Sequence, residues 1–263
     1  MSPDSMKPGV TTPPCAAIVL AAGAGTRMDS DLPKPLHPVG GRAMVLRVLD
    51  ALAGVDAAAV VVVVGHGADR VRDEVLAGAP QPKRLTFAVQ PRQLGTGDAA
   101  RVGLDALGEA AGASDVLVLA GDTPLLRSES LIELVAVRRR DGSAASLLTA
   151  RLDDPTGYGR VVRSDDGIAI VEQRDASQAE AQINEINAGV YCFDLAQLRR
   201  VLPQVRRANA AGEYYLTDAI GLLGRSGQGI SAVALNDPAE AMGVNDAAQL
   251  AACEEALAER QLR

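Results

Sequence analysis

The chain has 263 residues, of which 48% are hydrophobic and 22% charged, so it is long enough to bury a sizeable core as one large α/β unit or as two lobes. A net charge of −7 and an aromatic content of only 2% argue against a nucleic-acid binder, which needs a basic surface and usually aromatic rings. The three cysteines lie far apart and only two histidines are present, which excludes a disulfide framework or zinc site and favours a cytoplasmic location.

The first half of the sequence alternates short β-rich runs with amphipathic segments of helical length. Residues 1–14 are polar and rich in proline, which predicts a flexible tail. Strands are expected at 15–21, 58–65, 85–89 and 115–122, and helices at 43–54, 68–78 and 97–107. The longest apolar run, residues 57–64, is less than half of the roughly 20 residues that span a bilayer, so no membrane-spanning helix is expected.

The second half adds β-rich stretches separated by turn residues. Further strands are expected at 144–152, 159–164, 168–173, 188–193 and 230–235, and helices at 195–202, 215–224 and 246–262. This order predicts a Rossmann-like, three-layer α/β/α fold with a mixed, mostly parallel central sheet. We expect one domain at 15–245, with a first half at about 15–140 and a second part at about 141–245, followed by a C-terminal helix at 246–263.

Glycines follow the first expected strand, in the sequence LAAGAGTRMDSDLPKPLH at residues 20–37. The dinucleotide fingerprint GxGxxG fails because its third glycine would be Met28, and no GxxxxGK[ST] string occurs. What remains is a glycine turn followed by Arg27 and by Lys34 between two prolines, a set that suits a polyphosphate. The alternative is a glycine-rich turn with two solvated surface charges.

Eight motifs in register carry a resemblance to a known family. They are LAAGAGTRM with SDLPKPLH, QPRQLGTGDA, LAGDTPLL, DDPTGYGRVVR, IVEQRDA, EINAGVY, NAAGEYYLTD and a GVN that ends at Asn245. Together they resemble the sugar-nucleotide pyrophosphorylases, and among them the uridyltransferase domain of bacterial N-acetylglucosamine-1-phosphate uridyltransferases. The resemblance implies a fold of the nucleotide-diphospho-sugar transferase type and Mg²⁺-dependent transfer of UMP from UTP to N-acetylglucosamine 1-phosphate, with release of pyrophosphate.

The resemblance also implies that residues 15–245 form a nucleotidyltransferase domain, with the nucleotide-binding half at about 15–140 and the sugar-binding part at about 141–245, and it assigns roles to residues. Because two anions must meet in this reaction, catalysis depends on positioning and on cations, here Arg27 and Lys34. Asp122 and Asn245 would hold the Mg²⁺, although Asp122 could instead only shape a turn and Asn245 only cap the last helix. The implied nucleotide-binding residues are Leu20, Ala21, Ala22, Gly23, Gln90, Gly95, Thr96 and Asp122, and the implied sugar-binding residues are Gly159, Glu172, Asn187 and Asn245.

Several departures from the family pattern leave alternatives open. Ala120 stands where some relatives carry a larger residue, Arg174 where lysine is common, and Pro35 where an apolar residue is more usual. These departures weaken the sugar assignment, so a glucose-1-phosphate uridylyl- or thymidylyltransferase remains an alternative. A non-catalytic nucleotide-sugar-binding module is another. No hexapeptide-repeat acetyltransferase domain follows in this sequence, so acetyltransferase activity is not predicted, and small molecules rather than nucleic acid or membrane are the expected partners.

Overall fold

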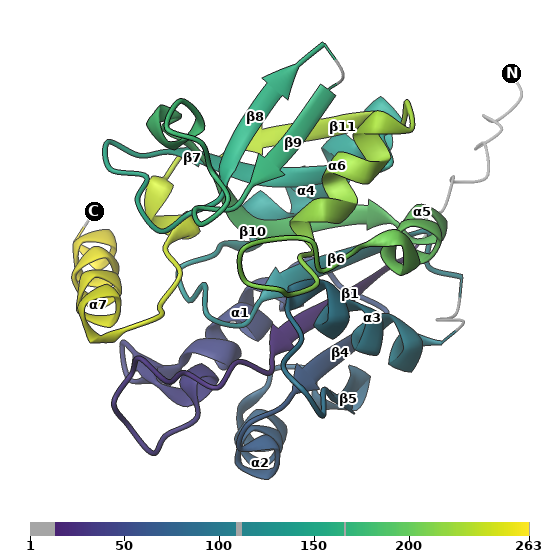
Figure 1. The fold of residues 1–263 in the computed structure, drawn as a ribbon. Coiled ribbons are helices and arrows are strands. Elements are labelled where there is room, and N and C mark those ends of the chain that lie inside the picture. The colour runs from purple at the N-terminus through teal and green to yellow at the C-terminus, as the bar shows by residue number, and fades with distance from the viewer. Residues whose placement is uncertain (1–13, 109–111, 166, 263) are drawn as a thin grey trace, which may run out of the picture.

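A central mixed sheet organises the protein in the computed structural model, which describes residues 14–108, 112–165 and 167–262 (Figure 1). The predicted tail at 1–14 lies almost entirely outside the described residues. Along the sheet the strand order is β11-β7-β10-β6-β1-β4-β5, and β8 and β9 branch from β10. The strands are β1 (Cys15–Ala21), β4 (Ala59–Val64), β5 (Leu85–Val89), β6 (Asp115–Ala120), β7 (Ala145–Arg151), β8 (Arg160–Ser164), β9 (Gly167–Val171), β10 (Glu185–Asp194) and β11 (Ile230–Ala234).

The parallel centre of this sheet is buried on both faces. β1 pairs in parallel with β4 and β6, with Ile18 opposite Val61 and Val118. Alternate residues of β1 enter two different cores: Ala17 and Val19 face one side, and Ala16 and Ile18 face the other. Two covered faces explain why these strands are almost uniformly apolar rather than alternating with polar residues.

Helices cover both faces, which confirms the predicted three-layer architecture. The helices are α1 (Met44–Ala53), α2 (Ala68–Gly78), α3 (Thr96–Leu107), α4 (Ser128–Asp141), α5 (Leu195–Val201), α6 (Thr217–Arg225) and α7 (Ala247–Gln261). Buried side chains of α1, α2 and α4 join one core, and those of α3, α5 and α6 join the other (Figure 1). Within the described ranges, no helix combines the length and apolarity needed to cross a membrane.

The sheet becomes antiparallel where β10 enters it. β10 runs against both β6 and β7, and β8 and β9 form a hairpin whose first residue, Arg160, also pairs with Ile186 of β10. The register of β10 against β7 shifts between Asn187 and Tyr191, and Gly189 in this bulge has a φ of +72°. Bulges re-aim side chains beside functional sites, so this irregularity marks the region where a ligand would lie.

Sequence analysis did not anticipate α4. Its Leu131 and Leu134 are buried, but a run of three arginines ends the helix and obscures the apolar stripe. Arg138 is itself buried and forms an ion pair with Asp115, which is fully buried at the start of β6. Arg139 and Ser114 also contact the Asp115 carboxylate, at 2.8 and 2.7 Å. This cluster fastens α4 to the centre of the sheet.

We expect Asp115→Asn to destabilise the protein strongly, because it removes the nearest counter-charge of the buried Arg138 guanidinium and leaves Asp194, at 3.9 Å, as the remaining partner. Breaking a buried ion pair from one side costs about 3–5 kcal/mol of unfolding free energy, measurable by urea denaturation. Asp141→Asn is the matched control, since Asp141 pairs with the exposed Arg140 on the same helix. A nearly unchanged urea midpoint for Asp115→Asn would contradict this account of the cluster.

Candidate functional site

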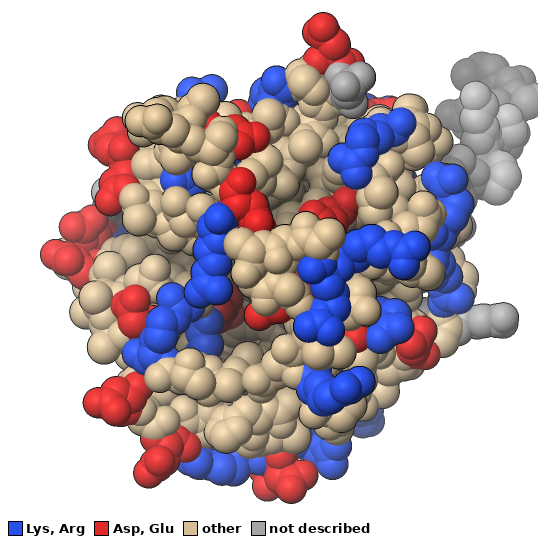
Figure 2. All heavy atoms as spheres, in the orientation of Figure 1, with Lys and Arg blue, Asp and Glu red and all other residues tan. Residues whose placement is uncertain are grey.

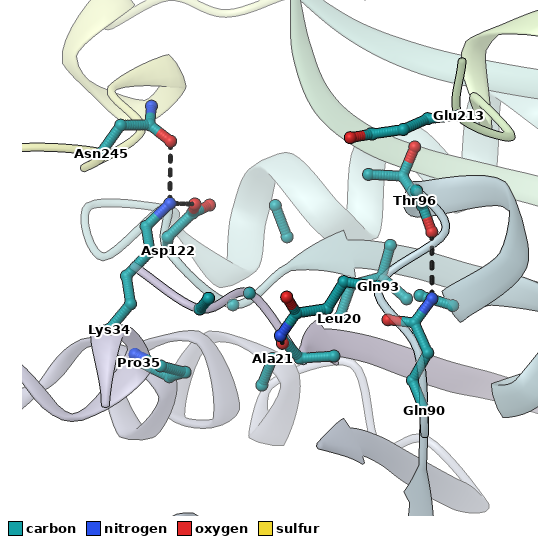
Figure 3. Close-up of a pocket in the computed structure, with 17 residues that line it drawn as sticks. Leu20, Ala21, Lys34, Pro35, Gln90, Gln93, Thr96, Asp122, Glu213 and Asn245 are labelled. Carbon is teal, nitrogen blue, oxygen red and sulfur yellow. Dashed lines mark hydrogen bonds and ion pairs between the residues drawn. The ribbon is translucent and has the colours of Figure 1, made fainter. Parts of the chain in front are cut away.

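A pocket of about 350 Å³ opens at the carboxyl ends of β1 and β6 (Figure 3). In an open parallel sheet this is the edge at which ligands bind. Leu20, Ala21, Ala22 and Gly23 form its floor where β1 ends, and the described part of the chain contributes the remaining lining residues Ala24, Lys34, Pro35, Gln90, Gln93, Gly95, Thr96, Ala99, Ala120, Gly121, Asp122, Glu213 and Asn245. Figure 2 shows this face of the molecule hollowed, with basic and acidic side chains interspersed around the hollow.

One end of the pocket holds a cation between two oxygen donors. The Lys34 ammonium lies 2.5 Å from Asp122 Oδ2 and 2.8 Å from Asn245 Oδ1 (Figure 3). These residues are 88 and 211 positions from Lys34 in the sequence, and the Lys34 side chain is only 13% exposed. The fold therefore brings three distant segments to one point, where a carboxylate and a carboxamide oxygen face a positive charge.

Two glycines make room for the segment that carries Lys34: Gly25 for Lys34 itself and Gly67 for Pro33. A Cβ atom on Gly25 would lie 2.7 Å from the Cβ of Lys34, and one on Gly67 would lie 2.4 Å from the Cγ of Pro33. Both glycines also have positive φ angles, +65° and +66°. The glycine turn thus has a second purpose besides close approach to a ligand, because it lets the segment from Pro33 to Pro35 pack against the end of β1.

The backbone next to Asn245 is fixed independently of its side chain. Val244 N–H donates to the Asp122 carbonyl at 3.0 Å, which places residue 245 beside the end of β6. The N-cap of α7 is Asp246, whose side chain accepts from Gln249 N–H, so Asn245 does not have the capping role that the sequence left open. Its carboxamide oxygen is directed at Lys34, and Asp122 likewise engages its side chain instead of only shaping a turn.

The opposite end of the pocket presents amide groups. The Gln90 side chain is buried, and its nitrogen donates to Gly95 O at 3.2 Å and to Asp98 Oδ2 at 2.8 Å. These two bonds occupy both amide hydrogens and leave the carboxamide oxygen as the group available to a ligand. Thr96 Oγ1 accepts from Leu216 N–H, which fastens this loop to the start of α6. The arrangement suits a planar base read by its edges.

Three of the four predicted sugar-binding residues, Gly159, Glu172 and Asn187, form a second cluster outside the pocket lining, whereas Asn245 lines the pocket. Asn187 N–H donates to the Gly159 carbonyl at 2.9 Å, and a Cβ on Gly159 would lie 3.5 Å from Glu172 Oε2. Thr217 Oγ1 donates to Glu172 Oε1 at 2.9 Å. Burial raises the pKa of Glu172, with the charge of Asp218 adding to the shift. The Asn187 carboxamide is engaged internally, donating to the Tyr191 hydroxyl and accepting from Gly189 N–H.

Two contacts join this cluster to the pocket. A Cβ on Gly189, at the bulge of β10, would lie 3.9 Å from the Cβ of Ala120, which lines the pocket. At the cation end, burial raises the pKa of Tyr158, whose hydroxyl bonds to the Gly243 backbone and feels the charge of Asp122. The two groups of predicted residues therefore lie along one continuous edge of the sheet.

The structure does not bring Arg27 into this arrangement. Its side chain is exposed in the turn before Lys34 and is not among the residues that line the pocket. The exposed Arg27 side chain could contact only an anion that extends out of the pocket. Conversely, sequence reasoning assigned no role to Gln93 and Glu213, although they lie in the quoted motifs QPRQLGTGDA and NAAGEYYLTD. Gln93 donates to Ala22 O at 2.9 Å, and Glu213 lines the pocket from the loop before α6, far from the other lining residues in the sequence.

Comparison with known proteins places the chain among nucleotidyltransferases. Residues 17–211 match the family described as the MobA-like NTP transferase domain. The chain is 48% identical over 249 residues to "Bifunctional protein GlmU" of Pelotomaculum thermopropionicum, covering 94% of this chain and 53% of that protein. It is 47% identical over 241 residues to the protein of the same name from Corynebacterium aurimucosum, covering 90% and 49%. The chain thus spans about half the length of the curated relatives it matches.

Solved structures of low sequence identity share the fold. A putative glucose-1-phosphate thymidylyltransferase from Bacillus anthracis, in complex with a sucrose, superposes with a TM-score of 0.74 at 20% identity, covering 92% of this chain and 94% of that one. A UDP-glucose pyrophosphorylase complexed with UDP-glucose superposes with a TM-score of 0.76 at 15% identity, covering 94% and 99%. These likenesses confirm the predicted fold class, and the relatives confirm the resemblance stated from the sequence.

We expect Glu172→Gln to raise the melting temperature at pH 7. The pKa of Glu172 is higher in the folded protein than in the unfolded chain, so folding is accompanied by proton uptake between these two pKa values. At every pH above the folded pKa, the ionised carboxylate lowers the stability of the fold. The difference from wild type should shrink as the pH falls towards the ordinary value of about 4.5. Melting curves across pH 4 to 7 measure it.

The control for this measurement is Glu180→Gln on the same loop. Hydrogen bonds from Ser177 lower the pKa of Glu180, so its loss should lower the melting temperature at pH 7 rather than raise it. Equal responses of the two variants would contradict the assignment of Glu172 as a buried carboxylate.

Proposed function

Because this chain belongs to the MobA-like NTP transferase family, we propose that it transfers UMP from UTP to N-acetylglucosamine 1-phosphate and releases pyrophosphate. The observation that carries the proposal is the single pocket with a cation and oxygen donors at one end and base-reading amides at the other. Its volume is in the range of small-molecule sites. The similarity to proteins named GlmU adds support for this sugar, and a cytoplasmic location is part of the same proposal.

In this proposal the chemistry needs no covalent intermediate on the protein. A phosphate oxygen of the sugar 1-phosphate attacks the α-phosphorus of UTP, and the bond to the leaving pyrophosphate breaks in line. The obstacle is repulsion between two anions, so positive charge at the phosphoryl oxygens lowers the barrier. Lys34 would supply that charge from the pocket wall, and Arg27 from the exposed turn beside it. Gln90, Gly95 and Thr96 would hold the uracil.

A divalent cation fits the same end of the pocket. Asp122 and Asn245 offer two oxygens of the kind that Mg²⁺ prefers, converging on one point that already holds a positive charge. Among the described residues no three acidic, histidine or cysteine side chains gather as a metal site, so phosphate oxygens and water would complete the coordination. Bound there, the ion would neutralise phosphate charge. Lys34 and the ion would compete for the oxygens of Asp122 and Asn245. The Lys34 ammonium could therefore contact the phosphates only after it has left these two oxygens.

The direct test mixes the protein with UTP, N-acetylglucosamine 1-phosphate and Mg²⁺ and measures pyrophosphate. We expect release that stops on chelation with EDTA. Glucose 1-phosphate and dTTP, used in turn, test the alternative substrates. Equal rates with glucose 1-phosphate would replace the proposed sugar, and tight UTP binding without any turnover would favour a non-catalytic binding module.

Lys34→Met should change activity and metal binding in opposite directions. The rate should fall by about 10²–10³, the usual loss when one charge stabiliser is removed. Binding of Mn²⁺ to the nucleotide-free protein should tighten at least about tenfold, because a like charge no longer occupies the space between Asp122 and Asn245. Mn²⁺ binding is followed by loss of the free-ion EPR signal.

Two further variants make this measurement specific. Asp122→Asn should abolish the gain in Mn²⁺ affinity when it is combined with Lys34→Met. Arg27→Met removes an exposed positive charge of the same loop and should leave Mn²⁺ affinity nearly unchanged. Weaker Mn²⁺ binding in Lys34→Met would show that the lysine and the ion do not share these oxygens.

A further inference from the structure

Arg160 is the largest fully buried side chain in the described structure, with 2% exposure. Its guanidinium donates to the Tyr158 carbonyl, to Gln173 Oε1 at 2.9 Å and to the Ala181 carbonyl at 3.4 Å. Within the described ranges no carboxylate lies at ion-pair distance from this guanidinium, and its Nε atom has no hydrogen-bond partner. The exposed Asp154 interacts with its charge only from beyond that distance. A buried charge without a closely paired counter-ion is costly, so the side chain calls for a reason beyond core packing.

The strand register gives that reason. Arg160 pairs with Val171 of β9 and with Ile186 of β10. The chain neighbours of these three paired residues are Gly159, Glu172 and Asn187, three of the four residues predicted to bind the sugar. Successive side chains along a strand point to opposite faces of a sheet. The Arg160 side chain therefore points to the face opposite to the one on which Gly159 and Glu172 meet.

The guanidinium ties together the segments that carry this row. Tyr158 belongs to the turn before β8, and Gln173 directly follows Glu172. Gln173 Oε1 also accepts from Gly157 N–H at 3.0 Å, so one carboxamide links the turn to Arg160. Ala181 lies in the short 3-10 helix Glu180–Gln182, at the far end of the loop that begins at Glu172. Three segments are thus fixed by one planar group with several directed donors.

We infer that Arg160 is a positioning residue for the sugar-binding row, acting from behind the sheet by fixing Gly159 and Glu172 relative to each other. The inference rests on the proposed function for the identity of the ligand. It assigns to Arg160 an effect on the sugar phosphate and none on the nucleotide, because its contacts reach neither Gln90 nor the loop at Gly95 and Thr96.

The test replaces Arg160 by lysine, which keeps the charge and loses the planar fork. The KM for N-acetylglucosamine 1-phosphate should rise at least about tenfold, since small misplacements of binding groups are that costly, while the KM for UTP stays nearly unchanged. A merely structural role would reduce the amount of active enzyme and leave both KM values as they are. Arg163→Met is the matched control, because it removes a guanidinium of the same strand that pairs with Glu185.

A second variant keeps the test decisive if Arg160→Lys does not fold. Gln173→Met removes the side chain through which Arg160 reaches Gly157, and it should raise the same KM, with a less than additive effect in the double variant. Unchanged KM for the sugar phosphate in Gln173→Met, or a parallel rise in the KM for UTP, would overturn the inference. Wild-type protein that turns over no sugar 1-phosphate would overturn the proposed function instead.

Discussion

The contact of the Lys34 ammonium with Asp122 and Asn245 is the interaction on which the site depends. It closes the pocket by joining the segment after β1, the end of β6 and the residue before α7. Apart from the single 3-10 turn Lys34–Leu36, none of these segments has a regular structure that would hold it there alone. The backbone bond from Val244 to Asp122 and the glycine contacts behind Lys34 supply that support. Charge and packing therefore agree on one geometry, which holds Asp122 and Asn245 together before any ligand binds.

Much of the fold follows from local sequence, because buried parallel strands leave a strong signal. β1 and β5 begin and end where their apolar runs do, and the helices between them follow an apolar stripe. α4 could not be found in this way, since its buried Arg138 reads as a surface charge unless its partner Asp115 is known to be nearby. That partner is distant in sequence, so the helix depends on tertiary contact rather than on periodicity.

The candidate site is predictable where motif and geometry coincide and less so elsewhere. The residues expected to hold the nucleotide line one pocket, whereas Gly159, Glu172 and Asn187 lie on a neighbouring hairpin and strand, and Arg27 is exposed. From the sequence, Asn245 could be either a metal ligand or the N-cap of the last helix. The structure excludes the capping role, because Asp246 is the N-cap of α7. Glu213 and Arg160 lie within motifs of the family resemblance, but no role could be assigned to either from the sequence, because their roles depend on segments that pack against them.

The contact between Gly25 and Lys34 has a consequence for how the opening motif is read across related sequences. A side chain at position 25 would collide with the lysine itself before it met any substrate. The colliding atom is the Cβ of residue 34, which every residue except glycine carries, and Gly25 also has a φ of +65°. Where the glycine is replaced, the lysine cannot keep its place, whereas loss of the lysine does not release the glycine. A surviving glycine without the lysine would then reflect the turn alone, with no bearing on whether that relative still handles phosphates.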